Sequence, residues 1–144
     1  MILPIFLLLA VQTSTVNSVP RVVVGRSQMP PSIVNELRRA VRPPRGQVPV
    51  QRLFSPGDYP TGADGQRGTV ELRLIIAPQG GVVFCSVTRS SGSAALDSAT
   101  CNTIRRREHY TPALDKDGKP TLGMVEETVD WESVFRNVPA VRRN

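Results

Sequence analysis

The side chains that could do chemistry are few and lie far apart: Cys85, Cys101, the single His109, Asp115 and Asp117. A four-ligand zinc site needs cysteines and histidines at characteristic spacings, and these residues match none of them. The two aspartates lie in a glycine-containing loop that lacks the glutamate needed to complete a calcium loop. We therefore expect no metal site and no cofactor.

The serine cluster does not indicate catalysis either. Ser90, Ser91 and Ser93 surround Gly92, but the Gly-x-Ser-x-Gly turn that exposes a nucleophilic serine is missing. His109 falls in a turn and is the only histidine that could act as a general base. The sequence therefore predicts no catalytic residue, and we expect a protein that is not an enzyme.

Two predicted strands and a helix must position the cysteines. From residue 68 the pattern has period two, which puts four apolar side chains on one face of a strand: Val70, Leu72, Leu74 and Ile76. Residues 78–81, Pro-Gln-Gly-Gly, form a turn in which paired glycines permit positive φ. Residues 82–88 then return as an antiparallel strand, with Val83, Cys85 and Val87 expected on one face.

A helix is predicted over residues 94–107. Ser93 is a natural N-cap, and Asp97 in the first turn complements the helix dipole. The apolar-to-neutral stripe consists of Leu96, Ala99, Thr100, Thr103 and Ile104, with Cys101 at its border. The arginines at 105–107 lie in the last turn, where cations complement the free carbonyls.

The placement of the cysteines favours a disulfide. Cys85 points from the second strand toward the face that the helix covers, and Cys101 lies two turns into that helix. Closing a loop of about fifteen residues stabilises a small domain by roughly 3 kcal/mol in the chain-entropy model. The alternative is a reactive thiol pair, although neither cysteine lies in a Cys-x-x-Cys motif or at a helix N-terminus.

The chain closes with a polar loop at residues 115–120 and a last strand at about 121–131. Val125, Val129 and Trp131 share one face of this strand, interrupted by Glu127. The other face carries Met124, Glu126, Thr128 and Asp130. We expect Trp131 to fill the core.

The segments before this domain differ in composition. Residues 2–11 are apolar but make only about half of the ~20 residues that a membrane-spanning helix needs, so residues 1–18 are interpreted as a signal peptide or a short anchor. Residues 19–54 form a connector rich in proline and arginine, with a short amphipathic helix near 32–42. The domain itself is expected at 55–135 and a flexible tail at 136–144.

The net charge of +6 and the pI of about 10.3 are carried almost entirely by arginine. The arginines are spread along the chain, and the one tight run, at 105–107, has no interleaved aromatic residues that could stack on bases. We therefore expect no nucleic-acid partner and interpret the charge as a solvated cationic surface.

The order of these motifs resembles the C-terminal domain of TonB energy transducers. The motifs that carry the resemblance are Tyr59-Pro60, Gly68-x-Val70, Gly80-Gly81, Ser-Ser-Gly-Ser at 90–93, Leu96-Asp97, Tyr110-x-Pro112-Ala113 and Asp117-Gly118-x-Pro120. They cover roughly residues 55–133. Within the family, the chain is similar to small exported single-domain forms with a cysteine pair.

The resemblance implies an α+β fold of the TonB/TolA C-terminal type: a three-stranded antiparallel sheet in β-β-α-β order with one main helix on one face. The first strand would be central and the last would be an edge. In the family, that edge takes up an extended peptide from the N-terminus of an outer-membrane transporter by β-augmentation. The residues expected to bind this peptide are Tyr59, Pro60, Leu122, Met124, Val125, Glu126, Glu127, Thr128 and Val129.

The resemblance also implies a periplasmic protein that takes part in energy-dependent transmembrane transport, exported by its N-terminal segment or held at the inner membrane by it. Full transducers have a longer membrane anchor and a longer spacer, whereas residues 19–54 reach only about 110 Å as polyproline II. Coupling to an inner-membrane proton-driven motor is therefore left open, as is a homodimer. The alternative function is a non-transducing scaffold domain of the envelope with the same fold.

Overall fold

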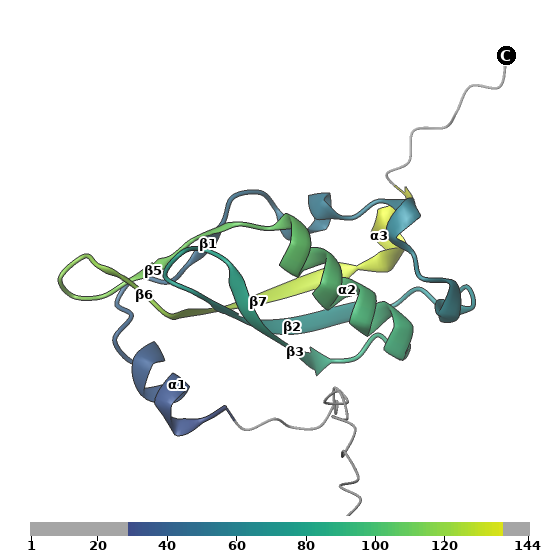
Figure 1. The fold of residues 1–144 in the computed structure, drawn as a ribbon. Helices are drawn as coiled ribbons and strands as arrows, with labels where there is room; N and C mark the ends of the chain where they lie inside the picture. Colours follow the sequence, from purple (N-terminus) through teal and green to yellow (C-terminus); the bar gives the residue numbers. More distant parts are fainter. Residues whose placement is uncertain (1–28, 137–144) are drawn as a thin grey trace, which may run out of the picture.

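A three-stranded antiparallel sheet lies at the centre of the computed structural model, which describes residues 29–136. Its order is β3-β2-β7, with β2 (Thr69–Ile76) between β3 (Val82–Arg89) and β7 (Gly123–Asp130). The helix α2 (Ala94–Arg107) packs on one face of the sheet (Figure 1). The predicted α+β fold, with a central first strand and the last strand at an edge, is confirmed. Residues 1–18, expected as a signal peptide or anchor, lie outside the described residues.

The core lies between α2 and the sheet. The four period-two residues of β2 are completely buried, as are Leu96 and Ile104 of α2 and Val129 of β7. Trp131 is also fully buried, and its indole Nε1 donates a hydrogen bond to Thr100 Oγ1 at 2.9 Å. A buried indole needs such a partner, so the expected role of Trp131 in the core is confirmed.

The helix α2 begins where the sequence predicts. Ser93 Oγ accepts a hydrogen bond from the backbone N–H of Leu96, as an N-cap does. Asp97 does more than complement the dipole, because its buried carboxylate accepts hydrogen bonds from Ser90 Oγ, Ser91 Oγ and the Ser91 N–H at 2.6–2.9 Å. The serine-rich loop is therefore tied to the first turn of the helix.

A β-bulge in β3 changes one predicted face. Ile75 pairs with Phe84 and Ile76 pairs with Val82, which leaves Val83 as an extra residue between them. Val83 is 51% exposed, so its expected place beside Cys85 and Val87 was wrong, and Val82 packs against the core instead.

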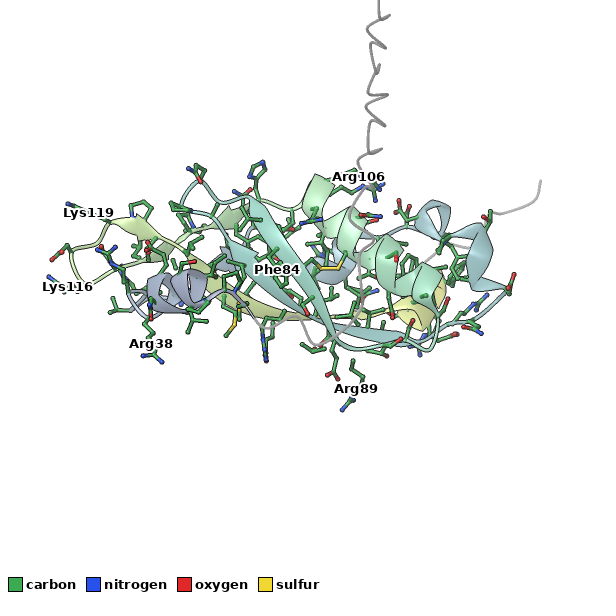
Figure 2. The ribbon with its side chains drawn as sticks, turned by 60° about the horizontal axis from the view of Figure 1, so that its bottom comes forward. Arg38, Phe84, Arg89, Arg106, Lys116 and Lys119 are labelled. Atoms are coloured by element: carbon green, nitrogen blue, oxygen red, sulfur yellow. A yellow bond between two sulfur atoms is a disulfide. The ribbon has the colours of Figure 1, made fainter. Side chains whose placement is uncertain are left out.

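The predicted disulfide is present. Cys85 of β3 and Cys101 of α2 are bonded, and the sulfur–sulfur bond crosses from the strand to the helix in Figure 2. Their Cα atoms are 5.9 Å apart, within the range that a disulfide spans without backbone movement. No free cysteine remains in the described part of the chain.

The segment before the sheet packs more closely than a connector was expected to. It contains the helix α1 (Pro31–Leu37), shorter than the expected 32–42, the short strand β1 (Arg45–Gly46), and three 3-10 turns: η1 (Val50–Leu53), η2 (Pro56–Asp58) and η3 (Thr61–Ala63). Phe54 is buried, and its ring packs edge-on against Trp131 with centroids 5.3 Å apart. Pro44 is buried against Gly123, where an added Cβ would lie 2.7 Å from Pro44 Cδ.

Four further short strands form two separate pairs. β1 pairs with β4 (Tyr110–Thr111), and β5 (Ala113–Leu114) pairs with β6 (Pro120–Thr121). The chain then enters β7, and the helix α3 (Trp131–Arg136) follows it directly. This last helix was not predicted.

The arginines at the end of α2 do not all act as free cations. Arg107 donates hydrogen bonds at 2.7 Å to both carboxylate oxygens of Asp58 and to the carbonyl of Leu53. These bonds hold the pKa of Asp58 well below its ordinary value, at about 2. Other cations, such as Arg38, Arg89, Arg106, Lys116 and Lys119, point away from the ribbon on different sides in Figure 2, which agrees with a dispersed basic surface.

Removing the disulfide should lower the stability of the domain. Replacing Cys85 and Cys101 together with serine reopens a loop with a sequence separation of 16, so we expect a loss of about 3 kcal/mol in the free energy of unfolding. Urea denaturation followed by Trp131 fluorescence measures it. A reductant should destabilise the wild-type protein by a similar amount and leave the double variant unchanged; equal midpoints for both proteins would contradict the prediction.

Breaking the ion pair between Arg107 of α2 and Asp58 should lower the free energy of unfolding by an amount that depends on pH. The folded pKa of Asp58 is depressed, so its contribution is fully present above about pH 4 and is lost as the pH falls through about 2. We expect Arg107→Ala to lower the free energy of unfolding by about 1–2 kcal/mol at pH 7 and by much less near pH 2. Arg106→Ala is the matched control and should have little effect at either pH.

Candidate functional site

The outer edge of β7 is defined by its pairing with β2. The eight pairs from Thr69↔Asp130 to Ile76↔Gly123 show no shift. The N–H of Trp131 bonds to the carbonyl of Gly68, which makes this pair a hydrogen-bonded one. Since hydrogen-bonded and non-bonded pairs alternate in an antiparallel ladder, the N–H and C=O groups that point away from β2 belong to Met124, Glu126, Thr128 and Asp130. We call these backbone groups the outer row.

Most of the outer row has no partner. Within residues 29–136, no hydrogen bond is formed to the backbone groups of Met124, Glu126 or Thr128 on this side. Leu122, just before β7, was expected to belong to the same edge; it is half-buried and likewise forms no such bond there. This edge therefore has free donors and acceptors along most of its length.

The end of the row is occupied. The N–H of Asp130 donates to Gln51 Oε1 at 3.0 Å, and Gln51 Nε2 donates to the carbonyl of Asp130 at 2.9 Å. Sequence reasoning missed Gln51, because a glutamine inside a proline-rich segment gives no signal of a partner 79 residues away.

The side chains of β7 alternate between two faces. Met124, Glu126 and Thr128 point away from α2; Met124 is 41% exposed, and Glu126 pairs with Arg73 at 2.9 Å. Val125, Glu127 and Val129 point toward the helix side, where Val129 is buried and the other two are half-buried. A chain paired with this edge would meet a methionine, an ion pair and a hydroxyl on one side.

Glu127 lies in a partly buried acidic environment rather than in solvent. Its Oε1 accepts a hydrogen bond from the hydroxyl of Tyr110 at 3.2 Å, and the buried Glu108 carboxylate lies nearby. Burial, with the charge of Glu108, raises the pKa of Glu127 above its ordinary value. Burial and the charge of Glu127 likewise raise the pKa of Tyr110.

Tyr59 and Pro60 lie at the C-terminal end of β7. The Tyr59 ring packs edge-on against Trp131 and Phe135, with centroids 5.9 and 5.3 Å away, and its hydroxyl donates to the carbonyl of Gln66. Pro60 precedes η3. The structure thus places Tyr59 just beyond Asp130 and not beside Met124, which lies about 20 Å away along the strand.

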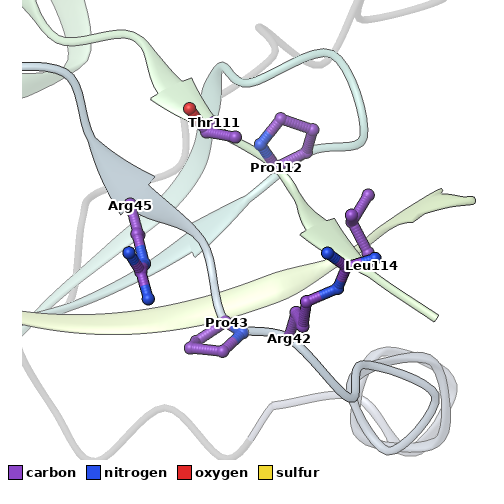
Figure 3. Close-up of a pocket in the computed structure, with 6 residues that line it drawn as sticks. All are labelled: Arg42, Pro43, Arg45, Thr111, Pro112 and Leu114. Carbon is purple, nitrogen blue, oxygen red and sulfur yellow. The ribbon is translucent and has the colours of Figure 1, made fainter. Parts of the chain in front are cut away.

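A shallow hollow lies elsewhere on the surface, between β1 and the segment of β4 and β5 (Figure 3). It is lined by Arg42, Pro43, Arg45, Thr111, Pro112 and Leu114. It contains no residue of β7 and none of the expected site residues.

Comparison with known families agrees with this geometry. Residues 58–132, just over half of the chain, match the family described as Gram-negative bacterial TonB protein C-terminal. The chain belongs to this family. A search of curated proteins and a search of solved structures found no match.

Membership of the TonB C-terminal family fixes the general kind of function. The family consists of energy-transducing or envelope-interacting domains of Gram-negative bacteria, which act through protein–protein contacts with outer-membrane transporters rather than as enzymes. Its place is the cell envelope. None of the helices in residues 29–136 has the length and apolar character to cross a bilayer, and no group of three or more ligating side chains there could hold a metal ion.

Neutralising Glu127 should stabilise this TonB-type domain. The folded pKa of Glu127 is raised, so the wild type loses stability relative to a neutral variant as the pH rises through that pKa. Glu127→Gln still accepts the Tyr110 hydroxyl, and we expect it to be more stable than wild type at pH 7 and equal to it below about pH 4. Urea denaturation at both pH values measures the difference.

The control for this experiment is Glu126→Gln, on the opposite face. It removes only the exposed ion pair with Arg73, whose contribution is at most about 1 kcal/mol. A Glu127→Gln variant that is less stable than wild type at pH 7 would show that the ionised carboxylate supports the fold.

Proposed function

We propose that β7 binds an extended peptide from the N-terminus of an outer-membrane transporter by β-augmentation, as part of energy-dependent transport across the outer membrane. The observation that carries the proposal is the row of unpartnered backbone groups at Met124, Glu126 and Thr128. Each of these residues offers one donor and one acceptor, and each bond made there adds about 1 kcal/mol net.

The opposite edge of the sheet, formed by β3, is less suited to binding a guest strand. β3 carries two register irregularities and is joined to α2 by the disulfide. The Val83 carbonyl in its bulge accepts a hydrogen bond from Arg105. Because bulges and covering side chains discourage strand addition, β7 is the better edge for a guest strand.

The side-chain environment favours a guest of mixed character. Val125 on the helix side and Met124 on the other can contact apolar guest residues, and Glu126 with Arg73 offers one charge of each sign. In this proposal Tyr59 and Pro60 contact the guest where it leaves the strand near Trp131. Coupling to an inner-membrane proton-driven motor would complete the transducer role.

The second candidate is a scaffold domain of the envelope that uses the same edge. The free row of β7 could equally pair with β7 of a second copy, since antiparallel edges are self-complementary. This alternative predicts concentration-dependent dimers and no response to transporter peptides.

Proline at Thr128 tests the proposal. The N–H of Thr128 points away from β2, so Thr128→Pro removes a donor from the edge while the β2–β7 ladder keeps its bonds. We expect about a fivefold loss of affinity for a peptide from a transporter N-terminus, which corresponds to one lost hydrogen bond. NMR titration of the amides of residues 122–129 measures the affinity, and Trp131 fluorescence checks that the variant folds.

Thr128→Ala keeps the N–H and is the matched control, and Met124→Pro is a second edge variant. Equal binding by wild type and both proline variants, or peptide-induced shifts confined to other elements, would refute the proposal. Sedimentation of the same proteins tests the scaffold alternative, which requires dimers that Thr128→Pro dissociates.

A further inference from the structure

The contact between Gln51 and Asp130 has the form of a strand pair. In an antiparallel hydrogen-bonded pair, each residue gives its N–H to the carbonyl of the other. Here the primary amide of Gln51 does the same with Asp130, at 2.9 and 3.0 Å. The side chain therefore stands where a residue of a fourth strand would otherwise lie.

The turn that holds Gln51 is fixed from several sides. Its flanking residues Val50, Leu53 and Phe54 pack on the core. The turn is closed by a hydrogen bond from the Arg52 N–H to the Pro49 carbonyl at 2.9 Å, and the Leu53 carbonyl accepts a bond from Arg107. Gln51 is thus presented to β7 by packed backbone.

Asp130 has no capacity left for a guest. Its carbonyl accepts a second hydrogen bond from Ser133 Oγ at 2.9 Å, which fills both lone pairs, and its N–H is used by Gln51. Its carboxylate accepts the N–H of Glu132, and Trp131 already begins α3. A guest strand can extend past Thr128 only by breaking the contact with Gln51.

We propose that Gln51 is a register-setting residue: its side-chain amide caps the outer row at Asp130 and restricts an added strand to the groups of Met124, Glu126 and Thr128. The role in register rests on the proposed function, whereas the cap itself does not. A guest would therefore pair over about five residues, and lengthening it toward Asp130 would add no hydrogen bonds.

Amide hydrogen exchange on the full chain tests the cap without any guest. After correction for intrinsic rates, we expect the Asp130 amide to exchange at least tenfold more slowly than those of Glu126 and Thr128. In Gln51→Ala it should exchange as fast as they do. Gln79→Ala, at an exposed position of the β2–β3 turn, is the matched control and should leave the exchange of the Asp130 amide unchanged. If the Asp130 amide of the wild type exchanges as fast as those of Glu126 and Thr128, the proposal that Gln51 caps the outer row is overturned.

Peptide length tests the role in register. The probes are a five-residue transporter peptide that binds wild type and the same peptide lengthened by two residues at the end that lies beside Asp130. Lengthening should change the affinity of wild type by less than twofold and raise that of Gln51→Ala about tenfold, with new shifts at Asp130. Gln51→Met has a side chain of similar length but no amide. It replaces Gln51→Ala in this experiment if the alanine variant folds poorly, and the same gain in affinity is expected.

The outcomes separate the two proposals. If lengthening the peptide raises the affinity of wild type and of the Gln51 variants by the same factor, the role of Gln51 in register is overturned while the proposed function stays intact. If neither protein binds any peptide, the proposed function fails and the register role with it, and the exchange of Asp130 alone shows whether Gln51 caps the edge.

Discussion

The pairing of β2 with β7 is the constraint on which the rest of the domain depends. Eight successive pairs join the two strands without a shift. The alternate residues of β2, from Val70 to Ile76, are fully buried on the helix side. A slip of one residue would turn the whole apolar set to the opposite face. The burial of β2 therefore fixes the register of β7, and that register determines which backbone groups of β7 point outward.

The two edges of the sheet differ in regularity and in their contacts with the surrounding structure. β3 is bulged, and the disulfide joins it to α2. β7 is regular, and among the described residues its outer row is satisfied only at Asp130. An open regular edge favours self-association. An exposed ion pair at Glu126 and a cap at Asp130 limit that tendency, and three consecutive outward residues remain available for a partner.

Local signals predicted much of the fold. Ser93 predicted where α2 begins, and the period-two pattern predicted the core face of β2. The placement of the cysteines on a strand and on the helix that covers it predicted the disulfide. What was missed depends on partners distant in sequence. Val83 looked like a core residue because a bulge has no signature in an alternating pattern. The bonds of Gln51 with Asp130 and of Arg107 with Asp58 join segments whose proximity follows only from the packed structure. At the candidate edge, the sequence predicted the strand, and the structure supplied the direction of each backbone group.

The part of the chain that matches the TonB C-terminal family begins at residue 58, yet several contacts that shape β7 come from earlier residues. Pro44 packs on Gly123 at one end of the strand, and Phe54 and Gln51 contact Trp131 and Asp130 at the other. A buried phenylalanine contributes about as much as any core residue, so a domain cut at the family boundary would lose core packing as well as the cap. The length of free edge that β7 offers to a partner therefore depends on the segment before residue 58 as well as on the part of the chain that matches the family.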